Sequence, residues 1–239
     1  MIELSKDFFE RAGRVKTAVA LGTPDRVPFV PTMGNLVAHE YGACVKDAMT
    51  DQTTILPALD RLLEDIKPDY FYAPDFFPKN TMDILRPINM NYAGKTPAFG
   101  DNFTYQVMDH TFMEDDEYDA FLQDPSAFLM HRVLAEKYEA LGGLKLLNPY
   151  NLCGPSVMGF ASLAAPPLTA ALEAMLAAGK ATQAYIGSTV AVSMHLMKKG
   201  FPVWGSAVAC APFDVFADNI RGLLNTKSAT AKSARLPVV

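Results

Sequence analysis

The feature that most constrains the fold is a strand, helix and strand pattern with short polar turns in the first 75 residues. Residues 27–32 and 70–73 are short apolar runs that predict strands. Between them, Thr53 is the predicted cap of a helix whose apolar side chains share one face: Ile55, Leu56, Leu59, Leu62, Leu63 and Ile66. This pattern is typical of a right-handed βαβ unit, in which functional groups gather beyond the carboxyl ends of the strands.

The rest of the chain adds helices and one further strand. Residues 78–112 are rich in Pro, Gly, Asn and Thr and predict an irregular excursion. Helices are predicted at 5–22, 113–124, 126–141, 167–178 and 183–199, and a third strand at 201–208. The sequence therefore predicts an α/β fold of the TIM (β/α)8-barrel type, incomplete, with about three barrel strands and an irregular insertion.

Composition limits which classes of partner and which cellular compartment we expect. The 239 residues include 21 basic and 26 acidic side chains, a net charge of −5, which argues against nucleic acid or an anionic membrane as partner and favours small molecules or proteins. Three widely spaced cysteines suit a reducing compartment, and the start of the chain lacks a signal-peptide pattern, so we expect a cytoplasmic protein. Prolines interrupt the uncharged run at 146–172, which argues against a membrane span.

Three motifs occur in order over residues 10–222. They are Thr17-Ala18 with Gly22 to Phe29, the segment Met113 to Pro125, and the segment Gly200 to Val203 leading into Ala211 to Gly222. Together they resemble the uroporphyrinogen decarboxylase superfamily, which also contains cobamide-dependent methyltransferases. The resemblance implies that residues 1–222 are the N-terminal part of a barrel domain that binds a small molecule.

Two departures separate this chain from the decarboxylases proper. Those enzymes carry an R-Q-A-G-R-Y motif after the first strand, whose arginines clamp tetrapyrrole carboxylates, whereas this chain has Met33 to Ala38 there. Asp218 stands where they carry a tyrosine. The resemblance thus points to the branch that transfers methyl groups between a methylcobamide and a thiol. The alternatives are a tetrapyrrole decarboxylase of porphyrin biosynthesis and a non-catalytic fragment.

The resemblance also implies site residues and ligands. Asp75, after the second strand, matches the family aspartate that faces the substrate and is the candidate catalytic residue; a turn aspartate is the alternative. Asp214, Asp218, His39 and Met33 are candidate substrate-binding residues, with helix capping the alternative for the aspartates and a partly buried structural role for His39. The substrate would be a tetrapyrrole, a corrinoid or a thiol, and the partners a corrinoid protein or a second copy.

The last residues depart from the family pattern. Residues 223–239 are basic, rich in small residues and aperiodic, and we expect them to be disordered. This loss of pattern predicts a chain truncated, or out of its reading frame, near residue 223. The late segment that holds zinc in the full-length methyltransferases is missing, so zinc and a corrinoid are expected for those members, and neither a metal ligand nor a cofactor is assigned within this chain.

Overall fold

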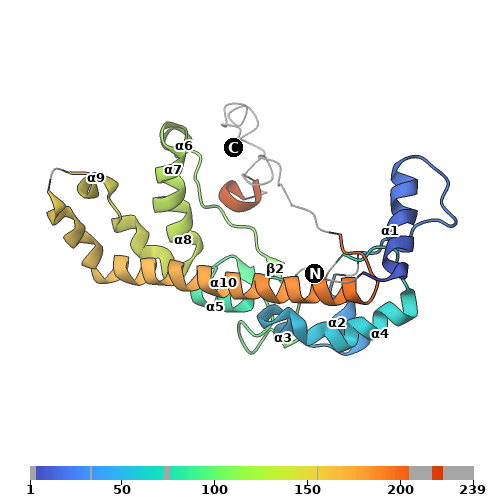
Figure 1. Ribbon diagram of the computed structural model, residues 1–239. Helices are drawn as coiled ribbons and strands as arrows, with labels where there is room; N and C mark the ends of the chain where they lie inside the picture. Colours follow the sequence, from blue (N-terminus) through green and yellow to red (C-terminus); the bar gives the residue numbers. More distant parts are fainter. Residues whose placement is uncertain (1–3, 33, 73–75, 155, 205–216, 223–239) are drawn as a thin grey trace. The chain divides into compact units, whose positions relative to one another are not determined.

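The computed structural model describes residues 4–32, 34–72, 76–154, 156–204 and 217–222. It is mostly helical (Figure 1). The α-helices are α1 (Lys6–Val19), α2 (Leu36–Tyr41), α3 (Val45–Thr50), α4 (Leu56–Ile66), α5 (Lys79–Leu85), α6 (Tyr118–Gln123), α7 (Pro125–Phe128), α8 (Ala135–Lys137), α9 (Pro149–Leu152) and α10 (Pro166–Lys198). Tighter 3-10 segments are η1 (Gln52–Ile55), η3 (Glu139–Leu146) and η4 (Val157–Ala164), and wider π-helical turns are η2 (Leu129–Leu134) and η5 (Ala217–Arg221).

The chain divides into two compact units, each built from several stretches of sequence. The first unit comprises Met1–Asn80, Tyr92–Tyr105 and Ala181–Ala207. The second unit comprises Thr81–Asn91, Gln106–Lys180 and Val208–Val239. Helix α10 contributes its first half to the second unit and its second half to the first.

The prediction of a TIM-barrel-type α/β fold is wrong. In the described residues the named strands are β1 (Met90–Asn91) and β2 (Gln106–Val107), which form one antiparallel pair. Where the predicted strands are described, at 27–32, 70–72 and 201–204, they are joined by isolated parallel bridges, Thr32 with Tyr72 and Phe71 with Val203. Residues 73 and 205–208 of the predicted strands lie outside the described residues. Prolines 28, 31 and 202 lie in these segments and have no amide hydrogen to donate, so a continuous ladder cannot form along them.

The amphipathic helix predicted after Thr53 is confirmed as α4. Its buried side chains include Leu59, Leu62 and Leu63, as the spacing requires. The cap differs from the prediction, because the Asp51 carboxylate accepts hydrogen bonds from the Thr53 amide at 2.9 Å and the Thr53 hydroxyl at 2.7 Å. Asp51 therefore starts a 3-10 turn, η1, from which α4 continues.

Helix α10 is a single helix of 33 residues, whereas the sequence predicted two. The predicted stop, Gly179, is helical, and no proline lies between it and the end of the helix at Lys198. None of the described helices is by itself long and apolar enough to cross a membrane; η4 and α10 meet the length and composition only as a pair bent by 82°.

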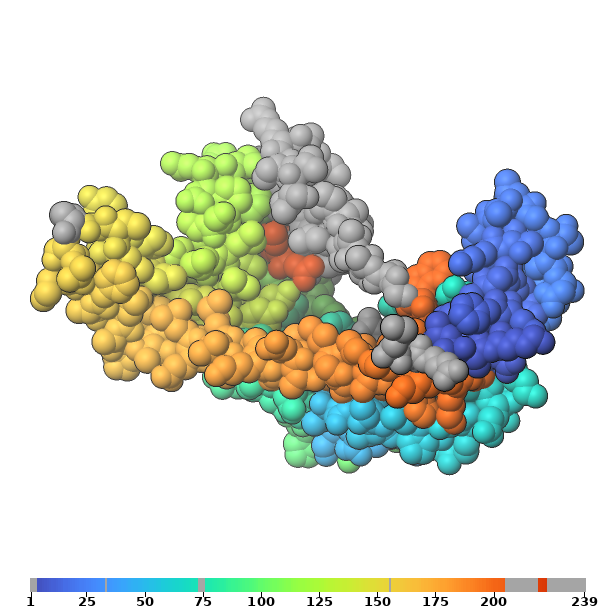
Figure 2. All heavy atoms as spheres, in the orientation of Figure 1, coloured from blue at the N-terminus to red at the C-terminus, as the bar shows by residue number. Residues whose placement is uncertain are grey.

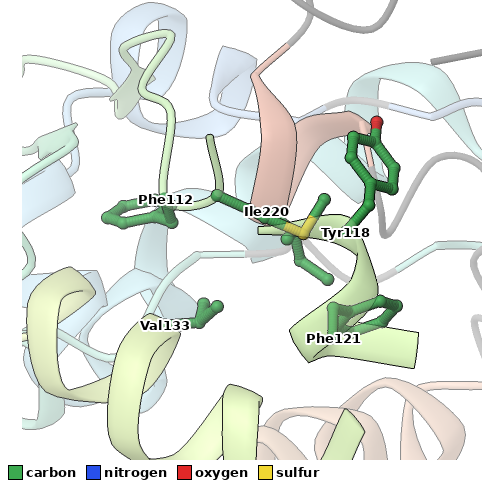
Figure 3. Close-up of a cluster of buried hydrophobic side chains, with 6 residues drawn as sticks. Phe112, Tyr118, Phe121, Val133 and Ile220 are labelled. Atoms are coloured by element: carbon green, nitrogen blue, oxygen red, sulfur yellow. The ribbon is translucent and has the colours of Figure 1, made fainter. Parts of the chain in front are cut away.

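Two apolar clusters form the core of the second unit. The first joins Phe112, Tyr118, Phe121, Val133 and Ile220, so that η5 packs on the segment around α6 and η2 (Figure 3). The second joins Leu141 and Leu144 of η3 to Leu168 and Ala171 of α10. Gly143 permits this packing, since a Cβ there would overlap the Pro167 carbonyl group.

We expect Gly143→Ala to lower the free energy of unfolding by about 1–3 kcal/mol, because the added methyl group must displace backbone at the start of α10. Gly142→Ala is the matched control, since its Cβ would meet only the Ala135 oxygen, at 3.8 Å. Urea unfolding followed by circular dichroism compares the two variants. Equal stability of the two would show that η3 does not approach α10 so closely.

Candidate functional site

Three segments of the first unit lie parallel to one another: residues 27–32, 70–72 and 201–204, named here the parallel segments. The Phe71 amide donates to the Pro202 carbonyl at 2.9 Å, and the Trp204 amide donates to the Phe71 carbonyl at 3.0 Å. The Asp69 amide donates to the Phe29 carbonyl at 2.8 Å. The middle segment, 70–72, is therefore bonded on both sides, and all three run in the same direction.

A buried carboxylate fixes the amino ends of the first two segments. The side chain of Asp69 is fully buried, and its Oδ1 accepts hydrogen bonds from Arg14 and, at 2.7 Å, from Arg26. Its Oδ2 accepts from the Phe29 amide at 2.9 Å. Two guanidinium groups and one amide thus compensate for the lost hydration of the carboxylate.

Helix α1 supplies the other anchors. The Arg14 guanidinium also holds Asp25 in a bidentate pair, with N–O distances of 2.5 and 2.7 Å. The hydrogen bond from Arg14 lowers the pKa of the Asp25 carboxyl to about 2. Arg11 donates to the Gly200 carbonyl at 2.6 Å and stacks over the Phe201 ring, 4.1 Å from its centroid. Arg14, through Asp69, and Arg11, through Gly200 and Phe201, therefore hold α1 against all three parallel segments.

The structure describes some of the candidate site residues and not others. Asp75, Met33 and Asp214 lie outside the described residues. Asp218 lies in η5 of the second unit, and its side chain is likewise outside the described part. His39 lies in the last turn of α2 in the first unit and is exposed, so the alternative of a partly buried structural histidine is wrong. Of these five candidate side chains, the structure thus describes that of His39 alone.

A second charged cluster in the first unit joins α4 to the end of α10. Asp60 accepts from His195 Nε2 at 2.7 Å through one oxygen and from Lys199 Nζ at 2.8 Å through the other. Burial by itself raises the pKa of the Asp60 carboxyl, but the hydrogen bonds and charges of Lys199 and His195 outweigh burial, and the pKa is lowered. We interpret this cluster as a clamp between two helices.

The second unit has an acid and base network of its own. Arg132 pairs with Glu117 at 3.0 Å and with Glu136, and His110 lies 3.5 Å from Glu136. Burial raises the pKa of Glu117, but the hydrogen bonds from Arg132 and the Glu114 amide outweigh it, and the pKa is lowered. Across the described ranges, no group of three His, Cys, Asp or Glu side chains could hold a metal ion.

Sequence reasoning missed the Asp69 network. Asp25, Arg26 and Asp69 lie in the short polar turns before the predicted strands, and the sequence pattern assigned no role to Arg14. The available signal was an acidic residue placed directly before an apolar run, together with an arginine before the other run. Only contact between segments more than 40 residues apart could show that these charges meet.

Comparison with known proteins gave no relative. No family model matches the chain. No curated protein and no solved structure is similar to it at a significant level. The motifs quoted above are therefore the whole basis of the family resemblance.

We expect Asp69→Asn to destabilise the first unit by about 3–5 kcal/mol, because the amide leaves Arg14 and Arg26 without their buried counter-charge. Asp101→Asn is the control, since Asp101 is 64% exposed and pairs with Lys46 at the surface. Thermal and urea unfolding of both variants measure the difference. Similar losses would contradict the anchoring role of Asp69.

The Asp60 clamp predicts an acid-dependent loss of stability. Because the folded-state pKa of Asp60 is lowered, its contribution is complete above the unfolded-state pKa of about 4 and is lost as the pH falls further, through the folded-state pKa. The stability gap between the native chain and Asp60→Asn should therefore be widest near neutral pH and close in acid. Urea unfolding from pH 7 to pH 3 measures this gap, and a gap independent of pH would rule out the clamp.

Proposed function

We propose that this chain acts in methyl transfer between a methylcobamide and a thiol acceptor, and that the substrate binds beyond the carboxyl ends of the parallel segments. The observation that carries the proposal is the shared direction of those segments. Because they run in parallel, their carboxyl ends lie at one edge, where we propose that the substrate binds. Met33 follows the first segment and Asp75 the second.

The chemistry of methyl transfer sets what this edge must do. The acceptor thiol loses its proton to solvent, and the thiolate sulfur forms a bond to the methyl carbon of the methylcobamide. The cobalt–carbon bond breaks at the same time, and its electron pair stays on the cobalt, which leaves as cob(I)amide. Asp75 is assigned the role of binding and orienting the acceptor, while Met33 and His39 are assigned to substrate contact.

The engaged arginines favour methyl transfer over tetrapyrrole decarboxylation. A decarboxylase needs guanidinium groups to clamp substrate carboxylates. Arg14 and Arg26 of the first unit are bound by Asp69 and Asp25, at the amino ends of the parallel segments. They lie at the end of the segments opposite to the proposed substrate edge, so they do not replace the missing clamp.

A second candidate is a non-catalytic chain that functions by pairing with another chain. The observation that favours it is exposed apolar surface in the second unit, where Val157, Met158 and Phe160 of η4 are 81%, 76% and 54% exposed. Monomeric proteins rarely leave such clusters uncovered.

The test is transfer from methylcobalamin to 2-mercaptoethanol by the purified chain, followed by the absorbance change of the corrinoid. We expect a rate above that of the thiol alone, and a loss of at least about tenfold in Asp75→Ala, the scale of one lost positioning contact. Asp101→Ala, an exposed aspartate of the same unit, is the control and should keep the rate.

Three results would contradict the proposal. A rate unchanged in Asp75→Ala would remove Asp75 from the site. Decarboxylation of uroporphyrinogen, detected by chromatography, together with no methyl transfer, would favour the decarboxylase. Absence of both reactions in a folded chain would favour the non-catalytic alternative.

A further inference from the structure

One face of α10 is uncovered over its first half, which belongs to the second unit. Leu168, Ala171 and Ala178 are buried and line the opposite side of the helix. The uncovered face is made of residues at helical spacing, here named the α10 face: Ala170, Glu173, Leu176, Ala177 and Lys180. Leu176 is 62% exposed at its centre. In Figure 2 much of the surface of α10, coloured orange, is uncovered toward the viewer.

The charges on this face are few and oppositely signed. Glu173 and Lys180 are the charged residues between Pro166 and Met197 apart from His195. They lie seven residues apart, which is two helical turns or about 10 Å along the axis. Among the described side chains neither has an ion-pair partner.

We propose that the α10 face binds the same face of a second copy of this chain, with the two helices antiparallel. A two-fold axis between Leu176 and Ala177 places Glu173 opposite the partner's Lys180, and the partner's Glu173 opposite Lys180. One self-complementary surface thus forms two equal ion pairs, as a closed two-fold dimer requires.

The side chains around the axis fit close packing of two helices. Ala170 and Ala177 leave little bulk between the helix axes, so the backbones can approach closely, and Leu176 fills the centre of the contact. Burial of the exposed Leu176 side chains supplies the apolar driving force, and the two ion pairs set the direction and the register.

The charges also argue for a second copy over lipid as the occupant. Glu173 and Lys180 would enter the hydrocarbon with the exposed apolar residues of this face, at a cost of several kcal/mol. Against the second copy, the same two charges are satisfied. A lipid surface is therefore an alternative outcome of the test.

The test is a charge swap read out as the dimer dissociation constant by analytical ultracentrifugation. Glu173→Lys and Lys180→Glu, each alone, place two like-charge contacts at the interface and should weaken the dimer at least about tenfold. The double variant restores opposite charges across the axis and should recover the native constant. Lys198→Glu, exposed at the end of the same helix, is the control and should change little.

Circular dichroism of every variant checks that the helix content is unchanged. A native chain that stays monomeric at every concentration would overturn the proposal, and so would a double variant as weak as either single variant. Sedimentation of the native chain with phosphatidylcholine vesicles, without self-association in solution, would replace the second copy by lipid.

Discussion

The first unit depends on one buried carboxylate, that of Asp69. Its two oxygens receive hydrogen bonds from Arg14, Arg26 and the Phe29 amide, so α1 and two parallel segments meet at a single residue. A carboxylate in this position would be strongly unfavourable without its partners, since it has lost its hydration entirely. The requirement that all these partners be in place makes the local arrangement specific. It positions the segments even though prolines prevent them from forming a full sheet.

Both units combine an apolar core with charged contacts. In the first, charges link elements that are distant in sequence, at Asp69 and again at Asp60, where His195 and Lys199 hold α10 to α4. In the second, aromatic and aliphatic clusters carry the packing, and a glycine, Gly143, allows η3 to lie against α10. The uncovered α10 face lies on the side opposite to the buried leucine and alanine residues, which is why it is available for a partner.

The proposed function and the proposed dimer rest on different features. Methyl transfer is argued from motifs in the sequence and from the direction of the parallel segments in the first unit. The dimer is argued from exposure and charge in the first half of α10, in the second unit. Either can therefore fail without removing the support for the other. Arg14 and Arg26 are paired with Asp69 and Asp25, so they are not free to bind an acidic tetrapyrrole. This pairing is the structural argument against the decarboxylase.

The sequence by itself determined the elements that depend only on neighbouring residues. Helix α4 follows from the spacing of its leucines, and the three parallel segments follow from short apolar runs between turns. Tertiary structure decided the rest. Whether apolar runs become strands depends on donors from other segments, which Pro28 and Pro202 lack, and whether Gly179 ends a helix depends on the conformation that packing imposes. The sequence selected single candidate positions, such as His39. Which side chains lie close to one another is a property of the folded chain and cannot be read from the sequence. The Asp69 network could not be predicted, because its charges are more than 40 residues apart and meet only once the segments pack.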